Sequence, residues 1–234
     1  MYDKWLDTLK TVALFYNIES SELNRMLLCL HPSIANYKKK EIITLAGSEF
    51  SGIGILVEGE VVVTKENFAG DRIIISKLKS GQMFGEIIAF SNQNKWPATV
   101  IASTNCTILF LPTEKIIGNC PNMCIGHKTL IQNMLKIVSQ KALKLNKKID
   151  YLSMKNLRTK ICNYLLEFYR KHQSNQFIIP LNRSELAEFL NVSRPSLSRE
   201  LMKMKDDNLI DYDRNAFKLL SIEKIKSICS TIDN

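Results

Sequence analysis

The sequence predicts an α+β protein with an antiparallel β-roll, one long helix and a winged helix-turn-helix. Three observations support this prediction. Short apolar segments separated by glycine-centred or polar turns follow one another between residues 33 and 111, a pattern typical of antiparallel sandwiches and barrels. A narrow apolar stripe with coiled-coil spacing covers residues 131–152. Two short amphipathic segments joined at Asn191 come next, and a predicted hairpin follows them.

The N-terminal part is expected to begin with helix and to continue as strands. Leu23, Leu27 and Leu30 lie on one stripe of a helix within the first 30 residues. Strands are predicted at residues 42–45, 54–57, 61–64, 73–78, 98–102 and 107–111, with turns at 47, 58–59, 69–71 and 80–81. The segment 81–90 interrupts these strands and predicts a turn that leads into a short helix.

The long helix carries a strict apolar seam. Its residues recur at alternating spacings of 4 and 3 and are Ile131, Leu135, Val138, Ala142, Leu145, Ile149 and Leu152. These are the a and d positions of a coiled coil, so the seam predicts a homodimer interface. The alternative is a single amphipathic helix packed on its own domain, which typically needs a wider apolar stripe.

Residues 183–201 predict a helix-turn-helix. The inward apolar positions are Leu186, Leu190, Val192, Leu197 and Leu201. Asn191 tolerates the left-handed backbone of the turn, Ser193 is a suitable N-cap, and Pro195 is acceptable in a first helical turn. The outward positions are Arg194, Ser196, Ser198 and Arg199. A second helix of this kind fits the DNA major groove, and the alternative is an ordinary surface pair of helices.

The elements around this motif complete a winged helix. A helix is predicted over residues 157–169 and a strand over 177–181, both before the helix-turn-helix. A hairpin of residues 209–212 and 216–219 is predicted after it.

Charge is distributed in agreement with DNA binding. The chain of 234 residues has a net charge of +9. Residues 1–118 have 12 basic and 12 acidic side chains, whereas residues 119–152 have six Lys and one Asp, and residues 153–234 have 14 basic and 10 acidic side chains. The excess positive charge therefore lies in the half with the helix-turn-helix, as phosphate binding requires.

Several function classes find no support in the sequence. No run approaches the ~20 apolar residues of a membrane span, and the segment MYDKWLDTLK lacks a signal-peptide pattern. We therefore expect a cytoplasmic protein with no membrane partner. No phosphate-binding glycine loop, paired metal ligands or nucleophile–base arrangement is visible, since the glycines at 52 and 54 form only a turn. The expectation is a protein that is not an enzyme and has no metal site.

Three segments together resemble the Crp/Fnr family. They are VEGEVVV at residues 57–63, SGQMFGE at 80–86 and ELAEFLNVSRPSLSREL at 185–201, and the resemblance extends from about residue 15 to 225. It implies a double-stranded β-helix, the jelly roll of cyclic-nucleotide-binding domains, in residues 1–120. A dimerisation helix and hinge would occupy residues 121–153 and a winged-helix DNA-binding domain residues 154–234. The implied function is a homodimeric transcription regulator that binds near-palindromic double-stranded DNA and RNA polymerase.

The resemblance also assigns residues to DNA contacts. Arg199 occupies the position of an arginine that commonly contacts a guanine in this family, and Arg194 matches an earlier arginine that contacts bases or backbone. A guanidinium can donate two hydrogen bonds to guanine. The alternative for Arg199 is a pair with Glu200, but adjacent helical residues do not face each other. Lesser base contacts or phosphate contacts are expected from Arg183, Ser184, Ser193, Ser196 and Ser198.

The cyclic-nucleotide pattern of the family is only partly present. Glu86 matches the glutamate that binds ribose, but Trp96 and Pro97 stand where an Arg-Ser pair binds the cyclic phosphate, and the position that contacts adenine lies near Leu145. We therefore predict no useful affinity for cyclic AMP, because a buried phosphate needs cationic or hydrogen-bonding partners. Glu86, Trp96, Pro97, Ala142 and Leu145 could instead line an apolar pocket for an unidentified small molecule. Alternatively, Trp96 fills the cavity and the protein is constitutive, and Glu86 caps a helix near Ile87.

The six cysteines leave one further alternative open. Cys120 and Cys124 are the only close pair in the sequence, which allows a thiol-redox-responsive regulator but does not fit the clustered ligands of an iron–sulfur site. A haem sensor needs an axial histidine, and His31, His127 and His172 are isolated and expected on the surface. No cofactor is therefore predicted. A cyclic-nucleotide-like binding module without direct gene regulation is the other alternative, although outward arginines at 194 and 199 argue against it.

Overall fold

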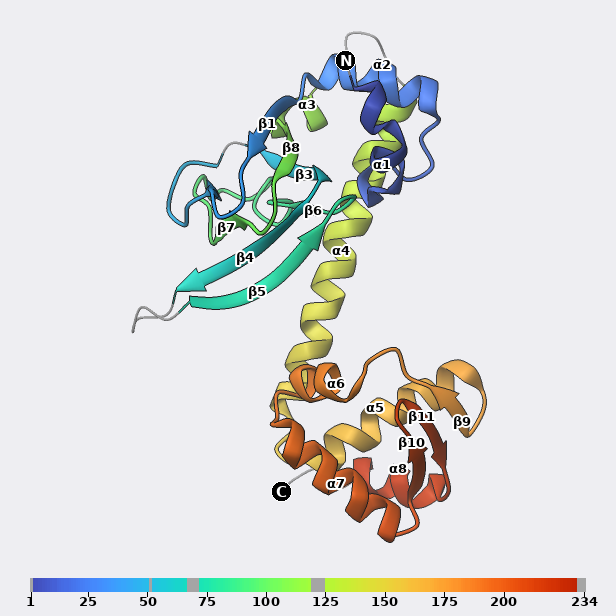
Figure 1. Ribbon diagram of the computed structural model, residues 1–234. Helices are drawn as coiled ribbons and strands as arrows, with labels where there is room; N and C mark the ends of the chain where they lie inside the picture. The colour runs from blue at the N-terminus through green and yellow to red at the C-terminus, as the bar shows by residue number, and fades with distance from the viewer. Residues whose placement is uncertain (1, 51, 67–71, 119–124, 231–234) are drawn as a thin grey trace. The chain divides into compact units, whose positions relative to one another are not determined.

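The chain forms two compact units in a computed structural model that describes residues 2–50, 52–66, 72–118 and 125–230. The units are Met1–Lys141 and Ala142–Asn234. Helix α4 (Ile125–Ser153) contributes its first part to the first unit and its last turns to the second (Figure 1). The division at residues 141 and 142 differs from the predicted boundaries at 120 and 153, because each part of α4 packs with a different set of elements.

The first unit contains two four-stranded antiparallel sheets, as the strand pattern predicts. One has the order β1-β8-β3-β6 and the other β2-β7-β4-β5. The strands are β1 (Ser33–Tyr37), β2 (Ile42–Thr44), β3 (Ile53–Glu58), β4 (Glu60–Glu66), β5 (Arg72–Lys79), β6 (Met83–Phe84), β7 (Thr99–Ala102) and β8 (Cys106–Leu111). Apolar side chains of both sheets form one core that includes Leu56, Val61 and Ile108. Alternate residues of β3 and β8 face this core, and the residues between them pack in a second core with the helices.

Short helices cover one side of this β-roll. They are η1 (Asp3–Trp5), α1 (Leu6–Thr11), η2 (Ala13–Phe15), α2 (Ser20–Leu30) and α3 (Thr113–Ile117). Leu130 and Met134 of α4 are buried against them, and the Asn133 side-chain amide donates to the carbonyl oxygens of Leu14 and Tyr16 at 3.0 and 2.7 Å. The N-terminal part of α4 is therefore fixed to its own unit through a face distinct from the predicted seam.

The short helix predicted within residues 81–90 does not form. After β6 the chain makes separate turns, in which the amides of Ile88 and Ala89 both donate to the carbonyl of Gly85. Gly85 has a φ of +88°, and a Cβ on it would lie 2.8 Å from the Trp96 ring. Glu86 therefore does not cap a helix. The segment is shaped by this tertiary contact and not by local helical propensity.

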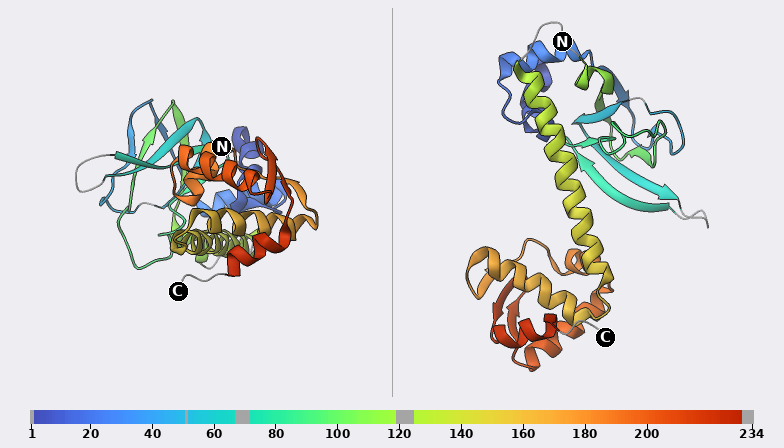
Figure 2. Two further views of the ribbon diagram at one scale, coloured as in Figure 1. Left: turned by 90° about the horizontal axis from the view of Figure 1, so that it is seen from below. Right: turned by 180° about the vertical axis from the view of Figure 1, so that it is seen from behind.

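The second unit is a winged helix, as predicted. Its elements are α5 (Leu157–His172), β9 (Gln176–Ile178), α6 (Arg183–Leu190), α7 (Arg194–Asp206), β10 (Ile210–Asp213), β11 (Ala216–Leu219) and α8 (Ile222–Ser230). The strands pair in the order β10-β11-β9. Helix α8, which the sequence pattern did not reveal, packs along α5 (Figure 2). The buried core of this unit includes Leu165, Leu186 and Leu201.

The last turns of α4 belong to this winged-helix core. Tyr151 is buried, and its ring contacts those of Tyr164 and Phe189. Its hydroxyl donates to Glu167 at 2.7 Å, and Lys147 forms an ion pair with the same carboxylate. Burial raises the pKa of Tyr151. The helix is thus joined to α5 by side chains on both sides of the short link at residues 154–156.

Candidate DNA-binding interface and effector cavity

The helix-turn-helix of α6 and α7 is fixed by a full set of capping interactions. Asn182 accepts from the amides of Ser184 and Glu185, while the Glu185 carboxylate accepts from the Asn182 amide, which forms a capping box. Asn191 ends α6 in the left-handed region at φ 56°, as predicted. Ser193 caps α7 by accepting from the Ser196 amide at 3.2 Å. Local sequence therefore fixes where both helices begin and where α6 ends.

The outward face of α7 presents most of the predicted DNA-binding side chains to solvent. Arg194, Ser198 and Arg199 are exposed, while Leu197 and Leu201 are buried beneath them. Arg199 has one long hydrogen bond, from Nε to the Pro195 carbonyl at 3.4 Å. Ser193 is also exposed, and its hydroxyl lies 2.8 Å from the half-buried Ser196 hydroxyl. The two arginines are thus available to a ligand on this face.

Arg183, at the start of α6, is occupied within the domain. Its guanidinium lies over the rings of Tyr212 and Phe217, at 4.9 and 5.7 Å from their centroids, and donates to the Arg214 carbonyl at 3.1 Å. Burial lowers the pKa of Arg183. The side chain therefore joins α6 to the hairpin of β10 and β11, while the neighbouring Ser184 remains exposed.

Arg158, which the sequence did not single out, contacts the recognition helix from behind. Its Nε lies 2.6 Å from Glu200 and its Nη1 2.6 Å from Asp207. The hydrogen bond to Glu200 raises the pKa of Arg158. Glu200 is therefore paired with α5 and not with Arg199, its neighbour in sequence.

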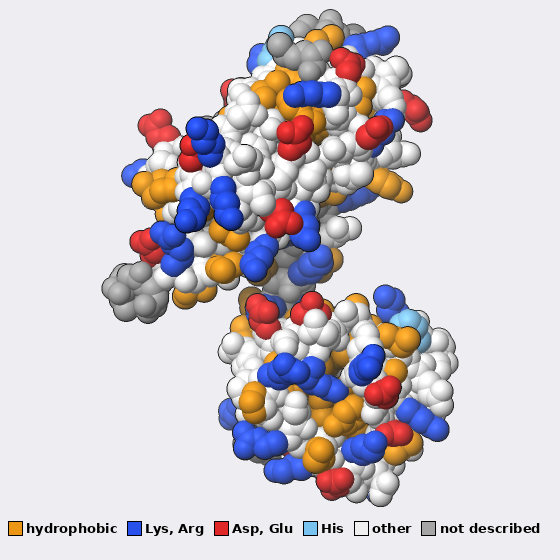
Figure 3. Space-filling model, viewed as in Figure 1, with side chains coloured by type: hydrophobic (Ala, Val, Ile, Leu, Met, Phe, Trp, Pro, Cys, Tyr) orange, Lys and Arg blue, Asp and Glu red, His pale blue; other side chains and the backbone are white. Residues whose placement is uncertain are grey.

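The second unit is the more basic of the two. Residues 142–234 have 17 Lys and Arg and 11 Asp and Glu, against 15 and 12 in residues 1–141. Figure 3 shows Lys and Arg side chains over the visible face of this unit, with Asp and Glu side chains between them. A surface of this kind attracts a polyanion without itself specifying a sequence.

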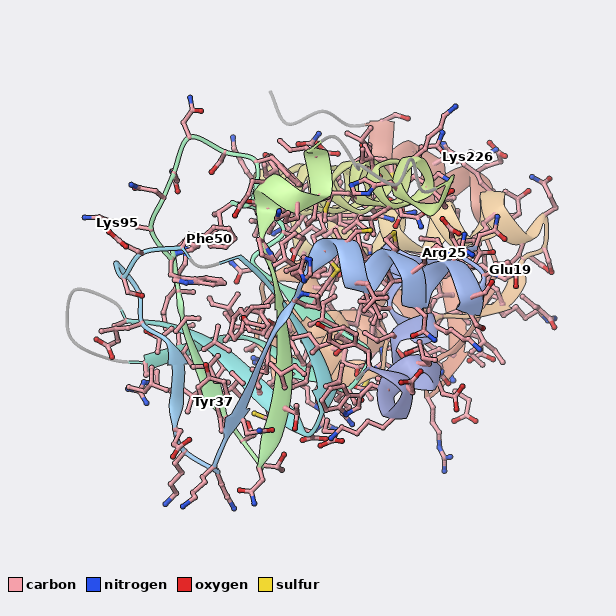
Figure 4. The ribbon with its side chains drawn as sticks, turned by 90° about the horizontal axis from the view of Figure 1, so that it is seen from above. Glu19, Arg25, Tyr37, Phe50, Lys95 and Lys226 are labelled. Atoms are coloured by element: carbon pink, nitrogen blue, oxygen red, sulfur yellow. The ribbon has the colours of Figure 1, made fainter. Side chains whose placement is uncertain are left out.

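The first unit contains a cavity of about 390 Å³ beside the turn after β6. Its lining is mainly apolar, and three of the predicted pocket residues, Glu86, Trp96 and Pro97, belong to it. The rings of Phe50 and Phe84 lie 4.8 and 5.7 Å from that of Trp96, which is buried. In Figure 4, Phe50 lies at the same end of the β-roll as Lys95, whose side chain points outward. Trp96 therefore packs in the wall and leaves the cavity open.

Glu86 connects this cavity to α4. Its side chain is buried, with one carboxylate oxygen paired to Lys141 and the other without a hydrogen-bond partner among the described residues. An unpartnered buried oxygen is costly. Ala142 and Leu145 are exposed on α4 and are not among the described residues that line the cavity.

Comparison with known proteins finds a matching domain family for each unit. A family model for the cyclic nucleotide-binding domain matches residues 34–118, and one for the Crp-like helix-turn-helix domain matches residues 159–228. The cAMP-activated global transcriptional regulator CRP of Salmonella typhimurium is 24% identical over 187 residues, which cover 77% of this chain and 86% of that protein. Its counterpart in Haemophilus influenzae is 22% identical over 184 residues, which cover 77% and 80%. The chain belongs to the Crp/Fnr family.

Solved structures of this family share the fold. The catabolite activator protein of Thermus thermophilus has a TM-score of 0.53 at 19% identity, with 93% of this chain and 98% of that chain covered. The global regulator CLP of Xanthomonas campestris has a TM-score of 0.51 at 16% identity, with 86% and 99% covered. The predicted fold class is confirmed. As a Crp/Fnr protein the chain is a DNA-binding transcription regulator and not an enzyme.

The other candidate sites gain no support for this Crp/Fnr protein. Cys120 and Cys124 lie outside the described residues. Burial raises the pKa of Cys162 to about 12, which keeps that thiol protonated and unreactive. His127 is buried and not on the surface as expected, with Nε2 bonded to the Ile116 carbonyl at 2.8 Å. No cluster of metal-ligating side chains occurs in the described part of the chain, and no helix there could cross a membrane.

Proposed function

We propose that the protein is a homodimeric, sequence-specific regulator that responds to a small molecule other than cyclic AMP in its β-roll. The observation that carries this proposal is the contrast between two exposed arginines on α7 and a mainly apolar cavity in the β-roll. Arg194 and Arg199 stand exposed on α7, while Trp96 and Pro97 occupy the wall where cyclic phosphate would need a cation.

The dimer is supported by the exposed seam of α4. Leu135, Leu145 and Ile149 are 64, 57 and 58% exposed in the single chain, and Ala142 and Leu152 belong to the same seam. Leucine and isoleucine at a and d positions pack well in a paired coiled coil. Ile131, Leu135 and Val138 also border an apolar cavity of about 430 Å³. A second copy of α4 would cover these side chains.

On DNA, each protomer would place α7 in a major groove. Two recognition helices related by a twofold axis contact half-sites about 34 Å apart, so the operator should be near-palindromic. Arg199 would donate to a guanine and Arg194 to a base or phosphate, and Ser184, Ser193, Ser196 and Ser198 are proposed for phosphate or lesser contacts. Arg183 would act mainly by positioning the wing. Contact with RNA polymerase and a cytoplasmic location accord with this role.

The effector would bind beside Glu86. The CRP proteins of Salmonella typhimurium and Haemophilus influenzae are described as cAMP-activated, but this chain has Trp96 and Pro97 at the positions of the phosphate-binding pair. A predominantly apolar molecule suits the cavity lining better than a nucleotide phosphate does. Binding that moves Glu86 would also disturb its pair with Lys141 of α4, which gives a direct connection from the cavity to the dimer helix.

The same geometry argues for a changed location of the hinge. The resemblance predicts a dimerisation helix and hinge within residues 121–153, yet Tyr151 and Lys147 near the end of this range contact Glu167 of α5. We propose that residues 142–153 move with the winged helix. The thiol alternative at Cys120 and Cys124 has no observation in its favour, and a binding scaffold without gene regulation does not account for the exposed arginines.

Three measurements test the proposal. Light scattering should give the mass of a dimer, and a random duplex library should yield a near-palindromic sequence. Isothermal titration with cyclic AMP should show no sub-micromolar binding. A monomer without sequence preference would overturn the regulator model, whereas tight cyclic AMP binding would overturn only the assignment of the effector.

A further inference from the structure

We infer that Arg158 is a positioning residue for DNA recognition, because it fixes the rotation of α7 and neutralises one carboxylate within that helix and one at its C-cap. The inference rests on DNA binding by this family and is independent of the effector and of the dimer. The guanidinium reaches from the first turn of α5 to Glu200 and Asp207, with both N–O distances 2.6 Å.

The geometry suits a guanidinium better than any other side chain. Glu200 lies within α7 and Asp207 is its C-cap residue, so Arg158 contacts both the middle and the C-terminal end of the helix. One planar group that donates from two nitrogens can hold both, which a lysine ammonium cannot do with the same directionality. Because Arg158 contacts α7 at two positions along its axis, the contact resists both rotation and tilt of the helix.

The backbone of Arg158 is itself fixed at the start of α5. Asn156 caps α5 by accepting from the Arg158 amide at 2.8 Å. The side chains of Arg158 and Glu200 are 27 and 18% exposed, so this pair is shielded from solvent, while Asp207 is 50% exposed. Glu200 therefore provides most of the positional restraint, since a partly buried ion pair is screened less than an exposed one.

The pairing also changes what DNA would meet on α7. Glu200 follows Arg199, the exposed arginine proposed for base contact. A carboxylate released from Arg158 would carry an uncompensated negative charge on this helix and would repel the DNA phosphates. Arg158 keeps this negative charge on the inner side of the helix and compensates it there.

The test compares Arg158→Leu with Lys226→Leu, a matched control. Both remove one positive charge from the same unit, but Lys226 is an exposed partner of Glu223 on α8 (labelled in Figure 4). Affinity is measured by fluorescence anisotropy for a duplex enriched from a random library by the unaltered chain, and for a mixed-sequence duplex. The expected loss for Arg158→Leu on the enriched duplex is about tenfold, the size of one misplaced base contact. The control should change by about twofold or less, as one distant charge does.

Two further variants make the result decisive. The double variant Arg158→Leu/Glu200→Leu removes the released carboxylate and should recover a large part of the lost affinity. Arg158→Lys keeps the charge but not the fork, and should lower the ratio of enriched to mixed-sequence affinity even if Arg158→Leu does not fold. The inference is overturned if the variants melt at lower temperature while their folded fraction binds both duplexes like the unaltered chain. Arg158 would then stabilise the domain only.

Discussion

The two units differ in how closely they follow the family to which the chain belongs. The second matches the Crp-like helix-turn-helix domain and has capped helices with exposed arginines at 194 and 199. The first retains the β-roll and Glu86 but has a buried tryptophan in the wall of its cavity. Our proposal therefore assigns the family's DNA-binding chemistry to the second unit and a different effector to the first. This contrast gives four predictions, and the largest expected effect is on the dimer and its affinity for DNA.

The seam of α4 provides the strongest test, because both DNA half-sites depend on it. Leu145→Glu would place a carboxylate at a d position facing its copy, and we expect the dimer to dissociate and DNA affinity to fall by more than about 100-fold. Leu143→Glu is the matched control, since Leu143 is 67% exposed and lies outside the seam. Sedimentation equilibrium and anisotropy check this. Equal behaviour of the two variants would remove the seam from the interface.

Substitution of Arg199 on α7 tests the proposed base contact directly. Arg199→Ala should cost about 1–3 kcal/mol of specific binding and relax the preference at one guanine in each half-site. The fold should be unaffected, because among the described residues the side chain makes a single long hydrogen bond, to the Pro195 carbonyl. Selection from a random library with the variant measures the lost preference. An unchanged selected sequence would show that Arg199 does not contact a base.

The same contrast explains what the sequence alone could predict. The helix-turn-helix was predicted residue by residue, since Asn191, Ser193 and Pro195 are local signals for a turn and a cap. Residues 81–90 were predicted wrongly as helical, because their path depends on the contact of Gly85 with Trp96. The two partners of Arg158 lie 42 and 49 positions away from it, and the partner of Glu86 lies 55 positions away. Pairings this distant have no periodic signature, so the positioning arginine and the lysine at the cavity were missed.

The packing of Trp96 against Gly85 predicts a moderate effect on the stability of the first unit. Gly85 has a φ of +88°, and an added Cβ would lie 2.8 and 3.0 Å from two atoms of the Trp96 ring. Gly85→Ala should therefore destabilise the first unit by about 1–3 kcal/mol, from backbone strain and overpacking combined. Gly47→Ala shares the strain, at φ +86°, but has nothing within 4 Å of the added Cβ. Chemical denaturation should thus rank Gly85→Ala as the less stable variant, and equal losses would mean that Trp96 does not constrain the turn.

The smallest effect concerns pH and the carboxylate of Glu58, at the end of β3. The indole N–H of Trp5 and the hydroxyl of Thr107 donate to Glu58 at 2.7 and 2.9 Å, and the Trp5 bond is the main reason that the pKa of Glu58 lies below its ordinary value of 4.5. A carboxylate whose pKa is lower in the folded state contributes stability above the unfolded pKa and loses it as pH falls through the folded one. Unaltered protein should therefore exceed Glu58→Gln in melting temperature at pH 7, by an amount that shrinks as the pH drops below 4.5. A difference independent of pH would mean that the charge of Glu58 contributes nothing, and that the amide replaces it in shape alone.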